Sequence, residues 1–451
     1  MLIEKLFIIF VLLVPVFIVA FSFWRQTYWF VLYWTIIVGA VRKWLLPGYQ
    51  EIIFFSIHML LVGVYARFFL LKRRNYSRSS RMLNFMILSL VVWGLISLTN
   101  PQMPHWAVGT IGFMIHFYFI PIAYLAPYVI RHPDDLMKGL RNYALFALPI
   151  LILGMIQYFL PPSHILNRYS SETLDMRIAL VGQYTRVTGT FSYISGYTAY
   201  LNALIMILMF LIPSVKTKRA RVFMLLLFLM TFLNLMMTGS RGPFFISLLS
   251  VVLYALISLK LGLRFIFKML SYFVLTVMIA GAVISQSKAI RSSAREVVNS
   301  FWLRTTQNED IGTRLVDTFT PFKFLGQAGI LGNGIGTTYQ GVQQFIPETA
   351  AMVKDYEEEP ERIVLEMGAV GYFLTYGLRL YILVCFVRLF FKLNKRDHKL
   401  LALIVFLFQL QFLQLSPLVF NLTTSVFYWF FTGMLFVLPK LERQAIVEKQ
   451  L

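Results

Sequence analysis

Two arginines, Arg186 and Arg241, stand at places in the chain where a positive charge is costly. Arg186 opens the stretch RVTGTFSYISGY directly before an apolar segment, and Arg241 lies in the short turn TGSRGPF between two apolar segments. A charge so close to hydrocarbon is unfavourable unless it is paired or solvated. The planar guanidinium group suits phosphate, so the pair predicts a site for a lipid-linked phosphate at the membrane surface. Alternatively, each is a helix-end arginine whose side chain reaches the lipid head groups.

The acidic residues concentrate in the stretch 285–366, which is also the longest run without an apolar segment of membrane length. It holds eleven of the twenty acidic residues, namely Glu296, Glu309, Asp310, Asp317, Glu348, Asp355, Glu357, Glu358, Glu359, Glu361 and Glu366. A polar insert of this kind must fold in water against the mouth of a helical bundle. If the protein performs chemistry, we expect that chemistry here.

Metal chemistry is not expected from the ligand types and their spacing. The six histidines are scattered along the chain, at His58, His105, His116, His132, His164 and His398. Outside the stretch 285–366, the acids expected to face outward are chiefly Glu172 and Asp175, and the lone Cys385 lies in an apolar run. We therefore predict neither a metal site nor a cofactor, and expect arginine to neutralise a phosphate.

The bulk composition sets the class of protein. The chain is 58% hydrophobic, 16% aromatic and only 14% charged, and its mean hydropathy is +0.71. These values exclude a soluble globule and predict an all-α polytopic membrane protein, with the lipid bilayer as a partner. The formal net charge of +21 comes from Lys and Arg that lie mainly in short turns, where they set topology. Nucleic acid is therefore not an expected partner.

Apolar segments of spanning length lie at 5–23, 27–41, 51–70, 83–99, 107–130, 143–160, 195–213, 221–237, 243–259, 267–285, 365–390, 400–416 and 418–438. We predict 12 or 13 transmembrane helices, since the second segment is short enough to be re-entrant. Basic turns recur every two spans, at 72–81, 131–141, 216–221, 260–268, 388–399 and 440–449. The positive-inside rule places these turns in the cytoplasm. Four segments then face the opposite side, namely 100–106, 161–194, 238–242 and 285–364.

This pattern divides the chain into a transmembrane bundle at 1–284, a large extracytoplasmic loop at 285–364, and C-terminal transmembrane helices with a cytoplasmic tail at 365–451. The rule leaves the orientation of the N-terminus open. Arg379 lies in mid-span with Thr375 and Tyr376 about one turn earlier, so we expect it to face the bundle interior. We expect the same of His58 and His116.

Four motifs occur in an order that resembles the O-antigen ligase and polymerase superfamily of bacterial surface-polysaccharide proteins. The motifs are RVTGTFSYISGYTAYL, TGSRGPFF two spans later, GILGNGIGTTYQG in the long polar loop, and ERIVLEMGAVGYF leading into a span. The resemblance covers about residues 180–375. A further stretch near the start, GAVRKWLLPG, is similar to related exopolysaccharide-pathway proteins.

The resemblance implies a GT-C-like helical bundle in the bacterial cytoplasmic membrane. It implies a metal-independent glycosyl transfer at the outer face, by a polymerase or a ligase, in which an acceptor sugar hydroxyl attacks the anomeric carbon of a glycan on undecaprenyl diphosphate. Its implied partners are that lipid-linked oligosaccharide, the acceptor glycan and other polysaccharide-assembly proteins. Arg186 and Arg241 fall on family positions that hold the diphosphate, and Arg314 and Arg362 are further substrate-binding candidates.

The sequence departs from this family at one position. Members typically carry a histidine eleven residues before the first glycine of the GxxG that opens the span after the loop, where it is proposed to activate the acceptor or position the donor. Gly368 and Gly371 form the GxxG here, and counting back eleven gives Glu357. A carboxylate can act as a general base, so Glu357 is the catalytic candidate, with Glu358 or Glu361 as substitutes. Alternatively, EEEPER is simply a solvated acidic surface.

Two other functions stay open. A flippase or exporter of lipid-linked oligosaccharide would carry ionisable residues within many spans and little outward polar mass. This chain instead concentrates its polarity in one outer loop, which favours the enzyme. A non-catalytic subunit of a polysaccharide export machine, one that has lost the histidine, also fits the sequence.

Overall fold

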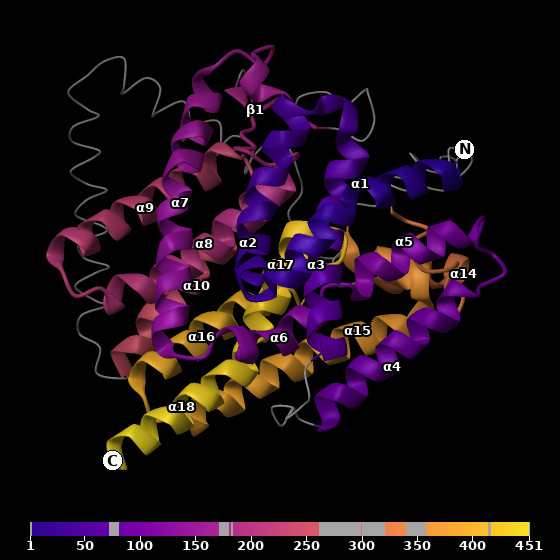
Figure 1. The fold of residues 1–451 in the computed structure, drawn as a ribbon. Coiled ribbons are helices and arrows are strands. Elements are labelled where there is room, and N and C mark those ends of the chain that lie inside the picture. The colour runs from indigo at the N-terminus through magenta and orange to yellow at the C-terminus, as the bar shows by residue number, and fades with distance from the viewer. Residues whose placement is uncertain are drawn as a thin grey trace.

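The computed structural model describes residues 2–71, 81–170, 180–181, 184–260, 299, 321–339, 358–413 and 416–450. Within these ranges the ordered elements are helices, apart from one antiparallel pair of two-residue strands, β1 (Leu180–Val181) and β2 (Tyr184–Thr185). The helices gather into one bundle, with the two chain ends on opposite sides of it (Figure 1).

The helices of the first half are α1 (Leu2–Ser22), α2 (Trp24–Ala40), α3 (Gln50–Leu71), α4 (Arg81–Leu98), α5 (Trp106–Phe117), α6 (Pro121–Val129) and α7 (Pro133–Phe159). Those of the second half are α8 (Ile194–Ser214), α9 (Lys218–Met237), α10 (Arg241–Lys260), α14 (Leu325–Ala328), α15 (Glu359–Lys392), α16 (Arg396–Leu410), α17 (Leu422–Thr432) and α18 (Met434–Gln450). A π turn, η1 (Val41–Leu45), continues α2, and single 3-10 turns lie at Pro47–Tyr49, Ile165–Asn167 and Pro321–Phe324.

Nine spans within the described ranges are long and apolar enough to cross a membrane, which confirms the polytopic membrane protein predicted from composition. The predicted segment 107–130 is one span built from α5 and α6, and 418–438 corresponds to the span Leu422–Gln444 of α17 and α18. Fewer spans are found than were predicted. Helices α2 and α16 have 17 and 15 residues, fewer than any of the nine, and the side chains of α1 are described only over Val11–Ser22. The predicted segment 267–285 lies outside the described residues.

Helix α7 begins at Pro133, well before the predicted span at 143–160. The Asp135 carboxylate accepts hydrogen bonds of 3.0 Å from the backbone N–H groups of both Arg131 and His132. Such a cap satisfies donors near a helix start, and proline is well suited to the first helical position. The predicted basic turn at 131–141 therefore lies mostly inside a helix.

Helix α8 forms the centre of the bundle. In its span, 83% of the residues are buried, and α7, α9, α10, α16 and α17 all pack against it. A helix that is apolar on all sides is expected in such a central place.

The two ends of the bundle differ in character. The basic end gathers the residues 127–138, 388–399 and 440–443, where Lys440 Nζ donates to Pro127 O at 2.6 Å and Glu442 Oε1 accepts from Asn394 N at 2.8 Å. At the other end, the residues 42–44 contact 165 and 188–192, Arg186 contacts 238–240, and Asn100 contacts the glycine-rich loop at Gly332. The contacts among these loops build the candidate site.

Candidate functional site

The Arg186 side chain is hydrogen-bonded into the turn that precedes α10. Its Nε donates to Thr238 O at 2.7 Å and its Nη2 donates to Ser240 Oγ at 3.0 Å. Because Arg241 is the first residue of α10, the structure brings both predicted arginines to this one turn. The first N–H groups of a helix lack partners within it, and its N-terminus carries a partial positive charge. The turn thus joins the Arg186 guanidinium and a second arginine residue to a helix start, an arrangement that favours an anion.

The backbone around Arg186 is also fixed. The Tyr169 hydroxyl donates to Arg186 O at 2.6 Å, and Val187 N donates to Met237 O at 3.4 Å. These bonds attach the segment that carries Arg186 to the end of α9 on one side and to the preceding loop on the other. We call Arg186, Arg241 and the turn Thr238–Ser240 the arginine turn.

A buried lysine from the start of the chain holds the segment that follows Arg186. Lys43 Nζ donates three hydrogen bonds of 2.9 Å, to Thr188 Oγ1, Gly189 O and Phe191 O, and the side chain is 1% exposed. These acceptors match the three N–H bonds of an ammonium group. These hydrogen bonds favour the charged ammonium form. Burial favours the neutral amine and lowers the pKa of Lys43 to about 7.

The approach of these two segments depends on Gly39 and Gln157. A Cβ on Gly39 would lie 2.4 Å from Thr190 O, so only glycine allows α2 to come this close. Gln157 Oε1 accepts from Gly189 N at 2.8 Å, and its Nε2 donates to Gly189 O at 3.0 Å. The stretches GAVRKWLLPG and RVTGTFSYISGY, far apart in the sequence, therefore form one packed unit.

A second polar cluster surrounds Glu366 in α15. Its carboxylate is fully buried and lies 2.9 Å from His116 Nε2. It also accepts from Thr338 N at 3.0 Å and from Thr338 Oγ1 at 2.6 Å. Arg362 completes the cluster, donating from Nη2 to Thr338 O at 2.9 Å and stacking its guanidinium 3.4 Å from the centre of the Phe420 ring. All the polar atoms of the buried carboxylate are therefore paired, as burial requires.

A break in α15 lets the glycine-rich loop reach this cluster. Gly368 has φ +66° and ψ −171°, and a Cβ there would lie 1.9 Å from Ile330 O. Two backbone carbonyls next to the break accept hydrogen bonds from the loop. Asn333 N donates to Leu365 O at 2.7 Å, and Gly334 N donates to Glu366 O at 3.0 Å. Residues 329–339 of the glycine-rich stretch thus form a tight loop against α15.

The acidic run at the start of α15 is not a solvated surface where the structure describes it. Glu359 is 4% exposed and its carboxylate binds Arg379 Nη2 at 2.5 Å and Val419 N at 2.7 Å. Glu361 is 5% exposed and lies 2.6 Å from Lys323 Nζ. The solvated-surface interpretation is therefore wrong for these two residues, because each buried carboxylate is paired with a cation, Glu359 with Arg379 of the same helix and Glu361 with Lys323 of the preceding segment. We call the residues Glu359, Arg362, Glu366, Arg379, His116 and Thr338 the α15 cluster.

The loop before α17 connects the two regions. Phe420 lies under Arg362 and 5.7 Å from the His116 ring, centre to centre. Three residues on, Thr423 Oγ1 would lie 3.5 Å from a Cβ on Gly196, which belongs to the first turn of α8 just after the segment of Arg186. The arginine turn and the α15 cluster therefore share one end of the bundle.

Three of the five predicted site residues lie within the described part of the chain. Arg186 and Arg241 lie together in the arginine turn, and Arg362 lies in the α15 cluster. Arg314 and Glu357 lie outside the described residues, while Glu358 is the residue that precedes the first turn of α15. Arg379 is 3% exposed and His116 is 8% exposed, so both face the interior as predicted.

Sequence reasoning missed Lys43, Thr338, Glu359 and Glu366 as parts of these clusters. One signal was present for Glu366, since a carboxylate in IVLEMG and a histidine in IGFMIHFYF both interrupt apolar segments. Two ionisable groups in apolar surroundings are best satisfied by one another. In the part of the chain that the structure describes, no group of three or more His, Cys, Asp or Glu side chains has the geometry to hold a metal ion.

Comparison with known proteins adds no family to this geometry. No protein-family model matches the chain, and no curated protein is significantly similar to it.

Proposed function

We propose that this protein transfers a glycan from undecaprenyl diphosphate to an acceptor hydroxyl, as a polymerase or ligase at the outer face of a bacterial cytoplasmic membrane. The observation that carries the proposal is the arginine turn, where the Arg186 guanidinium is hydrogen-bonded into the turn that begins α10 at Arg241. A diphosphate leaving group needs fixed positive charge at the place where its negative charge develops. Arginine supplies that charge in a form that binds phosphate through two parallel hydrogen bonds.

The proposed step is a substitution at the anomeric carbon. The acceptor oxygen forms a bond to that carbon while the bond from the carbon to the diphosphate oxygen breaks. The diphosphate keeps the electron pair, and the two arginines stabilise its charge. The acceptor proton passes to a base, for which Glu357 is the candidate from the sequence.

The α15 cluster supports this proposal in a positioning role. Glu366 is fully buried and paired with His116 and Thr338, so it is not available to a substrate. Its bonds hold the glycine-rich loop against α15. Lys43 has the same role for the segment that follows Arg186. Rigid supports of this kind keep a binding group in the geometry that the reaction requires.

One observation favours a second function, transport of the lipid-linked oligosaccharide across the membrane. Arg379 and His116 are buried ionisable residues within spans, each paired with a glutamate. Buried ionisable residues within spans often mark substrate or proton pathways. Here both pairs are closed by hydrogen bonds to neighbouring segments, and we therefore rank transport below glycosyl transfer.

The test is an assay of chain growth and of lipid transfer on the same purified protein in vesicles. The enzyme proposal expects longer glycans from undecaprenyl-diphosphate-linked repeat units, with growth that persists in EDTA and is lost in Arg186→Ala and Arg241→Ala. Arg221→Ala is the matched control, since Arg221 lies in the first turn of α9 and also donates to a backbone carbonyl, Val215 O, at 3.0 Å. Movement of the substrate to the other leaflet without chain growth would support transport instead.

A further inference from the structure

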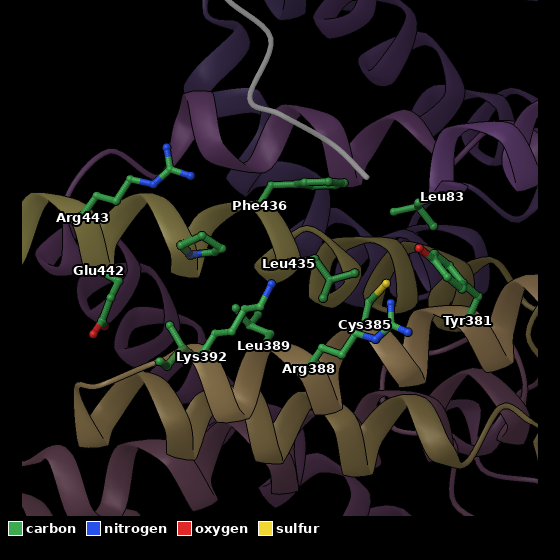
Figure 2. Close-up of a pocket in the computed structure, with 12 residues that line it drawn as sticks. Leu83, Tyr381, Cys385, Arg388, Leu389, Lys392, Leu435, Phe436, Glu442 and Arg443 are labelled. Atoms are coloured by element: carbon green, nitrogen blue, oxygen red, sulfur yellow. The ribbon is translucent and has the colours of Figure 1, made fainter. Parts of the chain in front are cut away.

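A cavity of about 490 Å³ lies at the basic end, between α15, α18 and the start of α4. Its apolar wall is formed by Leu83, Leu389, Leu393, Leu435, Phe436 and Pro439. In Figure 2, Arg443 and Lys392 lie toward one end of the cavity, and Leu83 and Tyr381 lie at the other. The volume falls within the range of about 300–1,000 Å³ that sites for small molecules occupy.

Three cations line this cavity, namely Arg388, Lys392 and Arg443. The one carboxylate in the lining belongs to Glu442, and it is bound elsewhere. Its Oε1 accepts from Asn394 N at 2.8 Å and Lys395 N at 3.0 Å, and its Oε2 lies 2.5 Å from His398 Nδ1. This carboxylate is therefore directed toward the start of α16, and the cavity keeps a positive balance.

The cavity lies where three candidate spans begin or end, which is the level expected for lipid phosphates. The span of α15 ends at Lys392, the span of α17 and α18 ends at Gln444, and α4 begins at Arg81. From Lys392 the lining continues along one face of α15 to Tyr381, about 16 Å toward the middle of the span. Large apolar side chains are exposed along α4 and α15 beside the cavity and beyond it, among them Phe85, Leu88, Leu380 and Val384.

We propose that this cavity binds the phosphate head group of an anionic phospholipid. Lys392 and Arg443 hold the phosphate, Arg388 adds positive charge farther along the cavity beside Cys385, and the apolar wall receives the glycerol and the first carbons of the acyl chains (Figure 2). The chains continue over the exposed apolar faces of α4 and α15. Basic pockets between helices at the side favoured by lysine and arginine are suited to anionic head groups. The site is separate from the arginine turn, which lies at the other end of the bundle.

The experiment uses Cys385, the one cysteine of the chain, which lines the cavity and is half-buried. The rate at which N-ethylmaleimide alkylates Cys385 is measured on the full-length protein in detergent. Added phosphatidylglycerol is expected to slow the reaction, whereas the zwitterionic phosphatidylcholine is not. Bound lipid is counted in parallel by native mass spectrometry.

The triple variant Arg388→Gln, Lys392→Gln, Arg443→Gln removes all three cations. It is expected to raise the phosphatidylglycerol concentration that gives half-maximal protection about 100-fold, at about fivefold per charge. If that variant does not fold, Arg443→Gln alone, at an exposed position, is expected to raise that concentration about fivefold. The matched control replaces three exposed cations outside the cavity, Lys216, Lys218 and Arg219, which belong to another of the predicted cytoplasmic basic turns. Equal protection by both lipids would overturn the proposal, and so would an equal loss in the control.

Discussion

The arginine turn and the α15 cluster both place guanidinium groups close to hydrocarbon, but they bind those groups differently. Arg379 is 3% exposed and forms a 2.5 Å ion pair with Glu359, and its Nη1 donates to Phe412 O at 2.8 Å. Arg186 is half-buried and donates to a backbone carbonyl and a hydroxyl in the turn that leads to Arg241.

The difference separates arginines that stabilise the fold from arginines that are oriented to bind a phosphate. A buried ion pair closed by further hydrogen bonds fixes the positions of the segments that carry it, and breaking it leaves a charge without water. A half-buried guanidinium that is oriented by its neighbours remains near solvent at a helix start. The comparison predicts that changes in the α15 cluster act on stability and that changes in the arginine turn act on turnover.

The largest expected effect is that of Glu359→Ala. The change leaves the buried Arg379 guanidinium and the N–H of Val419 without their acceptor, and it is expected to lower the free energy of unfolding by about 3–5 kcal/mol. Thermal unfolding in detergent measures it. Glu361→Ala is the matched control with a smaller loss, because its partner Lys323 is 39% exposed and regains water. Equal losses in the two variants would contradict the assignment of Glu359 to a closed pair.

Next in size is Gly368→Ala in the break of α15. An alanine at φ +66° is strained, and its Cβ would meet Ile330 O, so we expect a loss of about 3 kcal/mol in unfolding free energy. Gly377→Ala is the control in the same helix, where a Cβ meets only Met86 Cε at 3.6 Å. There alanine is expected to stabilise by about 0.5–1 kcal/mol. A similar loss at both positions would show that the break does not support the loop.

How much of this the sequence predicts depends on the range of the contacts. Apolar runs predict the helices, because span length and composition are local properties. The start of α15 at Glu359 is not local, since it depends on Arg379 from the same helix and on Val419 from the loop before α17. An acidic run by itself gives no sign of such partners.

In the candidate site, too, local features were predictable and long-range contacts were not. The motifs around Arg186 and Arg241 were recognisable, because each has a charge next to an apolar segment. Their contact through Ser240 was not predictable from either motif, and neither was the bond from Lys43 to Thr188 across 145 residues. Contacts of this length depend on how the helices pack, which a single sequence does not reveal.

The third prediction tests the arginine turn with Arg241→Lys. The variant keeps the charge and loses the planar fork, so turnover in the chain-growth assay is expected to fall by about one to two orders of magnitude, equivalent to about 1.4–2.7 kcal/mol. Its level in the membrane is expected to match the wild type, because lysine serves equally well as a topological anchor. Full polymer output from this variant would return Arg241 to the role of a side chain that reaches lipid head groups.

The smallest effect is expected from Ser240→Ala, which removes one hydroxyl from the arginine turn and can be compared with the loss of one hydroxyl from the α15 cluster. The change removes the hydroxyl that accepts from Arg186 Nη2 and leaves the bond from Nε to Thr238 O in place. Because water can replace that hydroxyl at a half-buried site, the cost is about 1 kcal/mol, a fall of about fivefold in turnover with little change in unfolding temperature.

Thr338→Val makes the same chemical change in the α15 cluster, where the hydroxyl donates to Glu366 at 2.6 Å and accepts from Arg362 Nε at 3.2 Å. Thr338 is 5% exposed, so water cannot take the place of its hydroxyl, and we expect the loss, about 1.5–3 kcal/mol, to appear in the free energy of unfolding. Turnover per folded molecule is expected to stay close to the wild type. The opposite result, in which Ser240→Ala lowers stability and Thr338→Val lowers turnover, would show that the α15 cluster binds the substrate and that the arginine turn stabilises the fold.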